Sequence, residues 1–248
     1  MEIDVKMNPV YLPYWNRPQF IQIFFGGSSS GKSYFLAQKI VLDNLNGVNW
    51  LCCRNVAAAL RRSTFNEVYE AIVRMGLGEY YQINHQEMVM TNRLNGKQIL
   101  FLGLDDPEKV KSIKPRHGVL ERIFVEEATE IKRAAFQQLK KRLRGMTPHQ
   151  KCIILAFNPI LRSHWIYQEF FGGWQDDRNY YEDQDLLILK TTYRDNLFLT
   201  AADRRLLEEE KDPYFYDVYT LGNWGILGNV IFKHWHVEDL QDLIPQFD

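Results

Sequence analysis

An eight-residue segment near the N-terminus has the composition of a phosphate-binding loop. It reads G-G-S-S-S-G-K-S and matches the pattern G-x-x-x-x-G-K-[ST] in full. Small residues let the backbone fold tightly around a phosphate, so that several N–H groups point at it, and the start of a following helix adds positive potential. We therefore expect the phosphates of ATP to bind to Gly26, Gly27, Ser28, Ser29, Ser30, Gly31, Lys32 and Ser33.

Two side chains of this loop predict its chemistry. Lys32 is expected to reach the β- and γ-phosphates and to support catalysis, and the Ser33 hydroxyl is expected to bind Mg²⁺. The loop also follows an apolar run at residues 20–25 and precedes an amphipathic run, which is the context that the mechanism requires. A Gly–Ser turn without function would need none of these features. ATP and Mg²⁺ are thus the predicted cofactors.

A second apolar run ends in two carboxylates. Residues 122–127 read R-I-F-V-E-E, and successive side chains of a regular strand point to opposite sides. We expect Glu126 to address the metal and Glu127 to act as the general base on the attacking water. Apolar runs that end in Glu-Glu are also common where a strand meets solvent, so this assignment depends on the phosphate loop. A water-activating glutamate favours hydrolysis over phosphoryl transfer.

The segments between these motifs predict the scaffold. Continuous apolar runs at residues 20–25, 50–53, 99–102, 123–125 and 152–157 are typical of buried parallel strands. Helical patterns lie at 32–44, at 64–75, where Thr64 and Glu67 would form a capping box, and at 129–143. Asn95 and Gly96 predict a hairpin turn between 88–91 and 97–102. The predicted fold class is α/β: an ASCE-type P-loop NTPase with a mainly parallel central sheet flanked by helices.

The composition changes after Pro159. Aromatic residues crowd into 165–181, and a strand pattern at 186–191 and two short helical patterns follow. We expect a P-loop ATPase core over residues 1–160, a small lid subdomain over 161–232, and a linker over 233–248. Lid packing is the expected role of the aromatic residues, with base stacking as the alternative.

Composition limits the other possibilities. The chain has 248 residues, 46% of them hydrophobic, a net charge of −1 and three cysteines without metal or disulfide spacing. No apolar run approaches the ~18 residues of a membrane span, which predicts a cytoplasmic protein. Basic side chains gather in one predicted helix and could bind DNA phosphates or form a solvated face: Lys132, Arg133, Lys140, Lys141, Arg142 and Arg144. His234 and His236 alone do not predict a metal site, and the adenine pocket is expected among residues 14–19.

Five further segments follow the phosphate loop in a fixed order. They read V-K-S-I at 110–113, V-E-E-A at 125–128, A-F-N-P at 156–159, T-Y-R-D-N at 192–196 and L-G-N-W-G at 221–225. With residues 26–33, this series resembles the large terminase subunit of tailed bacteriophages, the ATPase that drives genomic DNA into the capsid. The resemblance covers nearly the whole chain, and the later segments are more specific than the phosphate loop.

The resemblance implies two more site residues. Asn158 matches the coupling motif, which senses the γ-phosphate, although Asn-Pro is also an ordinary turn. Arg116 lies in the basic loop ahead of the Glu126 strand, where the resemblance implies an arginine that reaches the neighbouring subunit's nucleotide. A solvated loop charge is the alternative for Arg116.

The resemblance further implies a function and partners. The expected function is an ATPase motor domain that couples hydrolysis to translocation of double-stranded DNA into a procapsid, in the host cell cytoplasm. Expected partners are double-stranded DNA, the portal protein, the small terminase subunit and further copies of the chain in a ring, with no membrane. Another P-loop DNA translocase or helicase, and a nucleotide-gated assembly protein with little turnover, are the alternatives.

Three features depart from the family pattern. Many relatives have an arginine where this loop has Ser28, and most P-loop enzymes have an aspartate where this chain has Glu126. Family members also continue into a nuclease domain of RNase H-like fold, whereas this sequence stops at Asp248. Nuclease activity is therefore not expected in this fragment.

Overall fold

A nine-stranded sheet forms the centre of the residues that the computed structural model describes, 3–105 and 107–225. Its strand order is β3-β4-β5-β2-β6-β7-β1-β9-β8. The strands are β1 Ile21–Gly26, β2 Trp50–Arg54, β3 Tyr81–Asn84, β4 Val89–Asn92, β5 Gln98–Gly103, β6 Arg122–Glu126, β7 Cys152–Phe157, β8 Tyr180–Glu182 and β9 Leu186–Thr191. All five strands predicted for the core are confirmed.

The six central strands are parallel. β5, β2, β6, β7, β1 and β9 run in one direction, and β3, β4 and β8 add antiparallel pairs at the two ends. β7 lies between β1, which leads into the phosphate loop, and β6, which ends in Glu126. Since parallel strands share one carboxyl edge, the loops that follow β1, β2, β6, β7 and β9 meet there.

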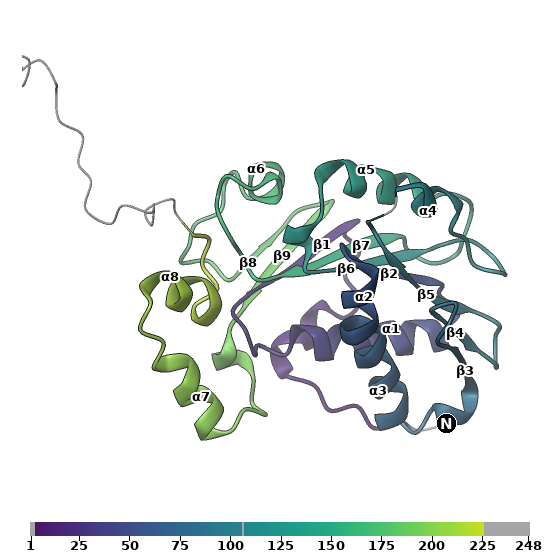
Figure 1. The fold of residues 1–248 in the computed structure, drawn as a ribbon, viewed down its shortest axis with the longest axis horizontal. Helices are drawn as coiled ribbons and strands as arrows, with labels where there is room; N and C mark the ends of the chain where they lie inside the picture. The colour runs from purple at the N-terminus through teal and green to yellow at the C-terminus, as the bar shows by residue number, and fades with distance from the viewer. Residues whose placement is uncertain (1–2, 106, 226–248) are drawn as a thin grey trace, which may run out of the picture.

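Helices cover both faces of the sheet (Figure 1). One face carries the 3₁₀ segment η1 (Pro9–Tyr14) with α1 (Lys32–Leu45), α2 (Ala57–Leu60), the π-helical turn η2 (Arg61–Phe65) and α3 (Asn66–Arg74). The other carries α4 (Pro107–Ser112), α5 (Arg133–Arg142) and α6 (Trp165–Phe170). The predicted fold, an α/β sheet flanked by helices, is confirmed. None of the helices in the described ranges is long and apolar enough to cross a membrane.

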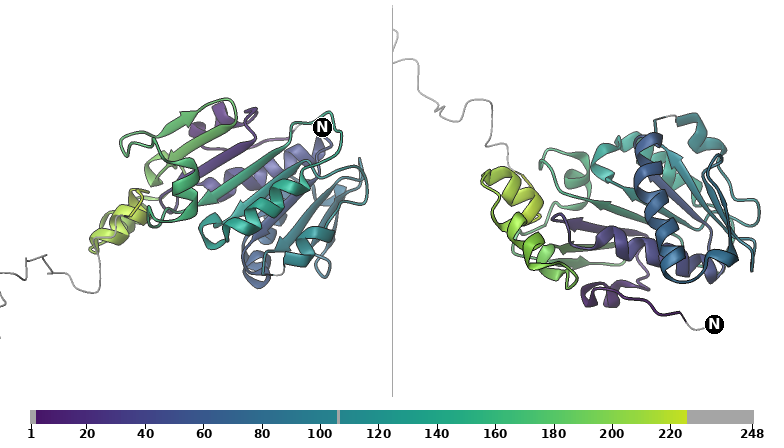
Figure 2. Two further views of the ribbon diagram at one scale, coloured as in Figure 1. Left: turned by 90° about the horizontal axis from the view of Figure 1, so that it is seen from above. Right: turned by 60° about the horizontal axis from the view of Figure 1, so that its bottom comes forward.

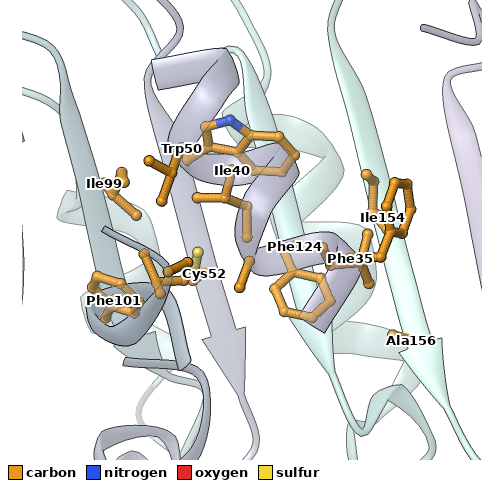
Figure 3. Packing of buried hydrophobic residues seen from close by; sticks show 14 of the residues in the cluster. Phe35, Ile40, Trp50, Cys52, Ile99, Phe101, Phe124, Ile154 and Ala156 are labelled. Atoms are coloured by element: carbon orange, nitrogen blue, oxygen red, sulfur yellow. The ribbon is translucent and has the colours of Figure 1, made fainter. Parts of the chain in front are cut away.

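Apolar side chains of α1 hold that helix on the sheet (Figure 3). Phe35 and Ile40 are buried against side chains of β2, β5, β6 and β7, among them Trp50, Cys52 and Phe124. Burial of each such side chain contributes about 1.5–3 kcal/mol to folding. The position of α1 matters for the site, because its first residue is Lys32.

Aromatic side chains fill the opposite face. Phe25 of β1 lies 5.0 Å from the ring of Phe171, 5.3 Å from Trp174 and 6.2 Å from Trp224 between ring centroids. Phe171 and Trp174 of the aromatic group thus pack on the central sheet rather than in a separate lid, whereas Tyr180 and Tyr181 are partly exposed on β8.

The predicted division into core and lid needs a correction. The strand at 186–191 is β9, which pairs in parallel with β1 inside the central sheet, so a boundary at residue 160 does not separate the sheet from a lid. Hydrogen bonding to β1 decides this placement, and it leaves no local sequence signal. The segments outside the layers are α7 (Ala201–Glu208), α8 (Pro213–Phe215) and η6 (Tyr216–Thr220), which lie together beside the sheet (Figures 1 and 2). The linker at 233–248, with His234 and His236, lies outside the described residues.

Three local predictions were wrong in detail. Thr64 does not cap a helix, because the helical segment begins at Ala57 and Thr64 lies within η2. Residues 128–130 form a 3₁₀ turn, η4 (Ala128–Glu130), and α5 starts only at Arg133. The hairpin between β4 and β5 is confirmed, but only Gly96 of the turn pair has a positive φ, 72°. The Asn95 amide instead donates to the carbonyls of Asn44 and Leu45 at the end of α1.

We predict that the buried charges behind α1 stabilise the fold. Asp43 lies 3.2 Å from Lys39 and also pairs with Arg122, and the side chains of Lys39 and Asp43 are only 3% and 7% exposed. Asp43→Ala would leave the buried Lys39 and the partly buried Arg122 without their anion, and we expect it to lower the free energy of unfolding by about 3–5 kcal/mol.

Chemical denaturation measures this loss. Glu70→Ala is the matched control. It removes the i,i+4 ion pair with Arg74, and the Glu70 side chain is 61% exposed, so the free energy of unfolding should fall by at most about 0.5 kcal/mol. Equal effects of the two substitutions would contradict the prediction.

Candidate nucleotide-binding and hydrolysis site

The backbone of the predicted phosphate loop depends on its glycines. Gly31 has a φ of 85° and caps the N-terminus of α1. At Gly26, with a φ of 136°, an added Cβ would lie 1.9 Å from the carbonyl oxygen of Thr191 at the end of β9. A side chain at either position would strain the loop or push β9 away.

Distant segments hold the loop in shape. The N–H of Gly27 donates to the Thr191 carbonyl over 3.0 Å, and the N–H of Ser28 donates to the Tyr219 carbonyl over 2.7 Å. The Asn196 amide donates to the Ser29 carbonyl over 2.8 Å. Asn196 also accepts from Asn8 of the N-terminal segment over 3.1 Å. The loop is therefore braced by β9, η6, the residues after β9 and the N-terminal segment.

The Lys32 ammonium group is buried inside the loop. It donates to the Gly27 carbonyl over 2.7 Å, to the Ser30 hydroxyl over 3.1 Å and to Asn158 Oδ1 over 3.3 Å. Burial lowers the pKa of Lys32 to about 8, and the charge of Glu127 acts in the opposite sense. Asn158, which follows β7, also donates to the Ser28 hydroxyl over 3.2 Å. Lys32 and Asn158 thus lie together at the phosphate loop.

The two predicted carboxylates lie at the same cavity. β6 ends at Glu126, and Glu127 has left-handed backbone angles (φ 46°, ψ 53°). The alternation expected of a regular strand does not apply to this pair, because the regular strand ends at Glu126. Left-handed geometry is uncommon for a residue with a side chain and clusters at functional sites.

Their surroundings nevertheless differ. Burial is the main cause that raises the pKa of Glu127, the negative charge of Glu126 adds to it, and Arg54 and Lys32 oppose it. Glu126 is instead anchored: its Oε2 accepts from the Ser63 hydroxyl and, over 2.7 Å, from Thr64 Oγ1, and it lies 3.6 Å from the Arg54 guanidinium.

Arg54, Ser63 and Thr64 were not predicted as site residues. Arg54 ends β2, next to β6 in the sheet. Its position after a buried parallel strand was the one signal in the sequence, since ligands of such sheets bind beyond the carboxyl ends. For Ser63 and Thr64 we find no comparable signal, because the π-helical turn brings them to Glu126.

A cavity of about 390 Å³ joins these groups. It is lined by residues 28–34, by both carboxylates, by residues 156–158, and by Asn196 and Leu199. Ser33 and Glu126 both face it, which brings a hydroxyl and a carboxylate oxygen to one place. Mg²⁺ is typically held by one or two carboxylates, a hydroxyl and substrate phosphates, so this donor set fits the ion.

The predicted adenine region lies elsewhere. Trp15, Asn16 and Arg17 line a separate cavity with Gln22 and Arg122, at the amino edge of the sheet. The reason is geometric: residues just before β1 are separated from the loop after it by a six-residue strand, about 20 Å. Tyr34, Asn196 and Leu199 line the nucleotide-sized cavity instead.

Arg116 is also at the amino edge. Its N–H donates to the side chain of Gln98, the first residue of β5, over 2.7 Å, and its guanidinium lies 3.5 Å from Glu87 and is 65% exposed. The length of the sheet separates it from the phosphate loop of the same chain. Arg116 therefore does not line the cavity at the phosphate loop of its own chain.

The basic side chains of α5 are partly engaged within the fold. Arg133 pairs with Glu169 over 2.8 Å, Arg142 donates to the Ile113 carbonyl, and the Lys140 ammonium lies 5.6 Å from the ring centroid of Phe136. Lys132, Lys141 and Arg144 are exposed.

Known proteins share this sequence and fold. A model of the phage terminase large subunit family matches residues 18–223. The PBSX phage terminase large subunit of Bacillus subtilis (strain 168) is 32% identical over 94% of this chain, which spans only 56% of that protein. The large terminase of a thermophilic bacteriophage, solved with ATP-gamma-S, superposes with a TM-score of 0.65 at 20% identity, over 87% of this chain and 51% of that one.

An isolated ATPase domain gives the same fold over nearly its full length. The large terminase ATPase domain of Thermus phage P74-26 superposes with a TM-score of 0.65 at 14% identity, over 89% of this chain and 94% of that one. At these identities the two solved structures establish the fold alone. The family model, which matches most of the chain, establishes more: this chain belongs to the phage terminase large subunit family.

Proposed function

We propose that this chain binds ATP in the 390 Å³ cavity and hydrolyses it, as the ATPase part of a DNA-packaging motor. The observation that carries the proposal is the meeting of Lys32, Ser33, Glu126 and Glu127 at this one cavity. Solved structures of the thermophilic-phage large terminase with ADP and with ATP-gamma-S support nucleotide as the ligand.

Each residue has a role in the proposed reaction. Loop N–H groups and the Lys32 ammonium bind the phosphates. Glu127 accepts a proton from the attacking water; the water oxygen bonds to the γ-phosphorus, and the bond from that phosphorus to ADP breaks. A desolvated carboxylate is a stronger base, because its raised pKa lies closer to the working pH. Ser33 and Glu126 would hold Mg²⁺, which supplies charge neutralisation at the phosphates. Asn158, bonded to Lys32 and Ser28, would report the state of the γ-phosphate to β7.

The proposed motor acts on double-stranded DNA, in a ring of copies on the portal protein of a procapsid, with the small terminase subunit, in the host cytoplasm. Membership of the terminase family supports these partners. Three exposed cations of the α5 region, Lys132, Lys141 and Arg144, offer a surface for DNA phosphates. Stimulation of phosphate release by duplex DNA and empty procapsids, but not strand separation, would distinguish a packaging motor from a helicase.

Replacement of the two glutamates tests the chemistry. Glu127→Gln should bind ATP normally, because the amide fits the same space, and should lower turnover on the order of 10²- to 10⁴-fold because the base is lost. Steady-state phosphate release and a nucleotide titration measure the two properties. Wild-type turnover in Glu127→Gln, with a slow but binding-competent Glu126→Gln, would reverse the two assignments. Absence of turnover in the wild type with DNA and procapsids would favour a nucleotide-gated assembly protein.

The pH dependence of binding tests Lys32. Because its pKa is lowered to about 8, the side chain loses its charge as the pH rises through 8, and only the charged form binds phosphates well. The dissociation constant for ATP should therefore rise about tenfold between pH 7 and pH 9.

Lys32→Arg is the control for this titration, because arginine stays charged throughout this range. Its affinity can differ from the wild type at pH 7, but it should change little with pH. An equally steep profile for both proteins would show that another group controls binding.

Arg116 is proposed to act from a neighbouring copy. The phosphate loop has serine at position 28, and an arginine supplied to the transition state is worth about 10³- to 10⁵-fold in rate. Turnover per molecule should thus rise with protein concentration, and Arg116→Ala should bind ATP but stay slow throughout.

A mixture of Arg116→Ala with Glu127→Gln provides the decisive measurement. Some interfaces in mixed oligomers would pair an intact Arg116 with an intact Glu127, so part of the turnover should return. No recovery in oligomers demonstrated to be mixed would count against action across the interface.

A further inference from the structure

The π-helical turn η2 places two consecutive hydroxyls on one carboxylate oxygen. Ser63 and Thr64 both donate to Glu126 Oε2, the latter over 2.7 Å. Neighbouring residues of an ordinary α-helix do not face the same point. π-Helical turns are rare and frequent at functional sites, and here the turn separates α2 from α3 at the edge where Glu126 ends β6.

Burial and charge strengthen this contact. Thr64 is only 2% exposed, so its hydroxyl depends on the carboxylate for a partner. Hydrogen bonds to an ionised acceptor are roughly twice as strong as those between neutral groups. The Arg54 guanidinium joins the same group, 3.6 Å from Glu126 Oε2 and 3.3 Å from the Ser63 hydroxyl. One carboxylate oxygen of Glu126 is thus held from three sides.

The anchored oxygen adjoins the proposed metal ligand. A small second cavity between α1, α3 and β6 is lined by Ser33, Thr64 and Glu126, and Ser33 and Glu126 also line the main cavity. With Oε2 fixed by η2, the other oxygen of Glu126 is the one that can turn toward Ser33. Glutamate has one more rotatable bond than aspartate, so its carboxylate needs such support to stay in one orientation.

We propose that Ser63 and Thr64 are positioning residues that orient Glu126 for binding of the magnesium–nucleotide complex. The inference rests on the proposed function, in which Glu126 is the metal-side acid, and it adds η2 to the machinery of the site. It also explains why a glutamate can serve at this place. Neither hydroxyl touches the nucleotide or the reacting atoms in this role.

The gain in nucleotide affinity caused by Mg²⁺ is the measurement. ADP affinity is determined by fluorescence with and without Mg²⁺, and the ratio is compared between the wild type and the Ser63→Ala, Thr64→Val double variant. Removal of groups that orient a metal ligand costs about 10- to 100-fold, so the Mg²⁺-dependent gain should fall by that factor. Metal-free ADP affinity should stay the same, and the Mg²⁺ concentration for half-maximal turnover should rise.

Two single substitutions serve as controls. Thr64→Ser keeps the hydroxyl and should retain most of the gain. Thr147→Val removes the same kind of bond, from Thr147 Oγ1 to Glu121 Oε1 over 2.6 Å, at the amino edge of the sheet, and should leave the gain unchanged. Thermal unfolding of each variant separates folding from function, and Thr64→Val alone replaces the double variant if the latter does not fold.

If Mg²⁺ raises the ADP affinity of a folded Thr64→Val or double variant as much as that of the wild type, the inference is overturned, whatever the change in stability. Failure of the proposed function gives a different pattern. In that case the wild type would not hydrolyse ATP, or Glu126→Gln would itself leave the Mg²⁺-dependent gain unchanged.

Discussion

The buried positive charge of Lys32 is the constraint on which the rest of the site depends. An ammonium group loses hydration when the loop closes around it, and its pKa falls to about 8 as a result. The surrounding groups compensate: loop carbonyls and Asn158 accept its hydrogen bonds, and the negative charge of Glu127 acts on it from the end of β6. Burial also affects Glu127: it raises the pKa of this carboxyl group, and the negative charge of the adjacent Glu126 raises it further. Lys32 and Glu127 each oppose the effect of burial on the pKa of the other, and Arg54 adds to this effect at Glu127.

The difference between the two adjacent glutamates comes from the backbone rather than from their side chains. Glu126 still belongs to β6 and meets the hydroxyls of η2, whereas Glu127 leaves the strand in a left-handed conformation. Both carboxylates line the same cavity, and the hydroxyls of η2 bind only Glu126.

β9 and η6, which follow β7 in the chain, contact and support the phosphate loop. β9 pairs with β1, and the end of β9 contacts Gly26 closely enough to exclude any side chain. η6 accepts the N–H of Ser28 through Tyr219, and Trp224 packs 6.2 Å from Phe25 at the end of β1. A shift of η6, or of α7 and α8 beside it, would consequently change the backbone of the phosphate loop, because Tyr219 accepts the N–H of Ser28.

Short local patterns predicted the phosphate loop, the five core strands and the Glu126–Glu127 pair at the end of β6, whereas the resemblance to the terminase family implied Asn158. Other features became visible only in the folded chain: β9 joins the central sheet, Arg116 and residues 15–17 lie at the amino edge, and Thr64 contacts Glu126 instead of capping a helix. Strand pairing, and the packing of one helix beside another, depend on residues far apart in the chain. Local sequence patterns do not predict such partners, whereas they do predict where a strand ends in Glu-Glu and where a loop needs glycine.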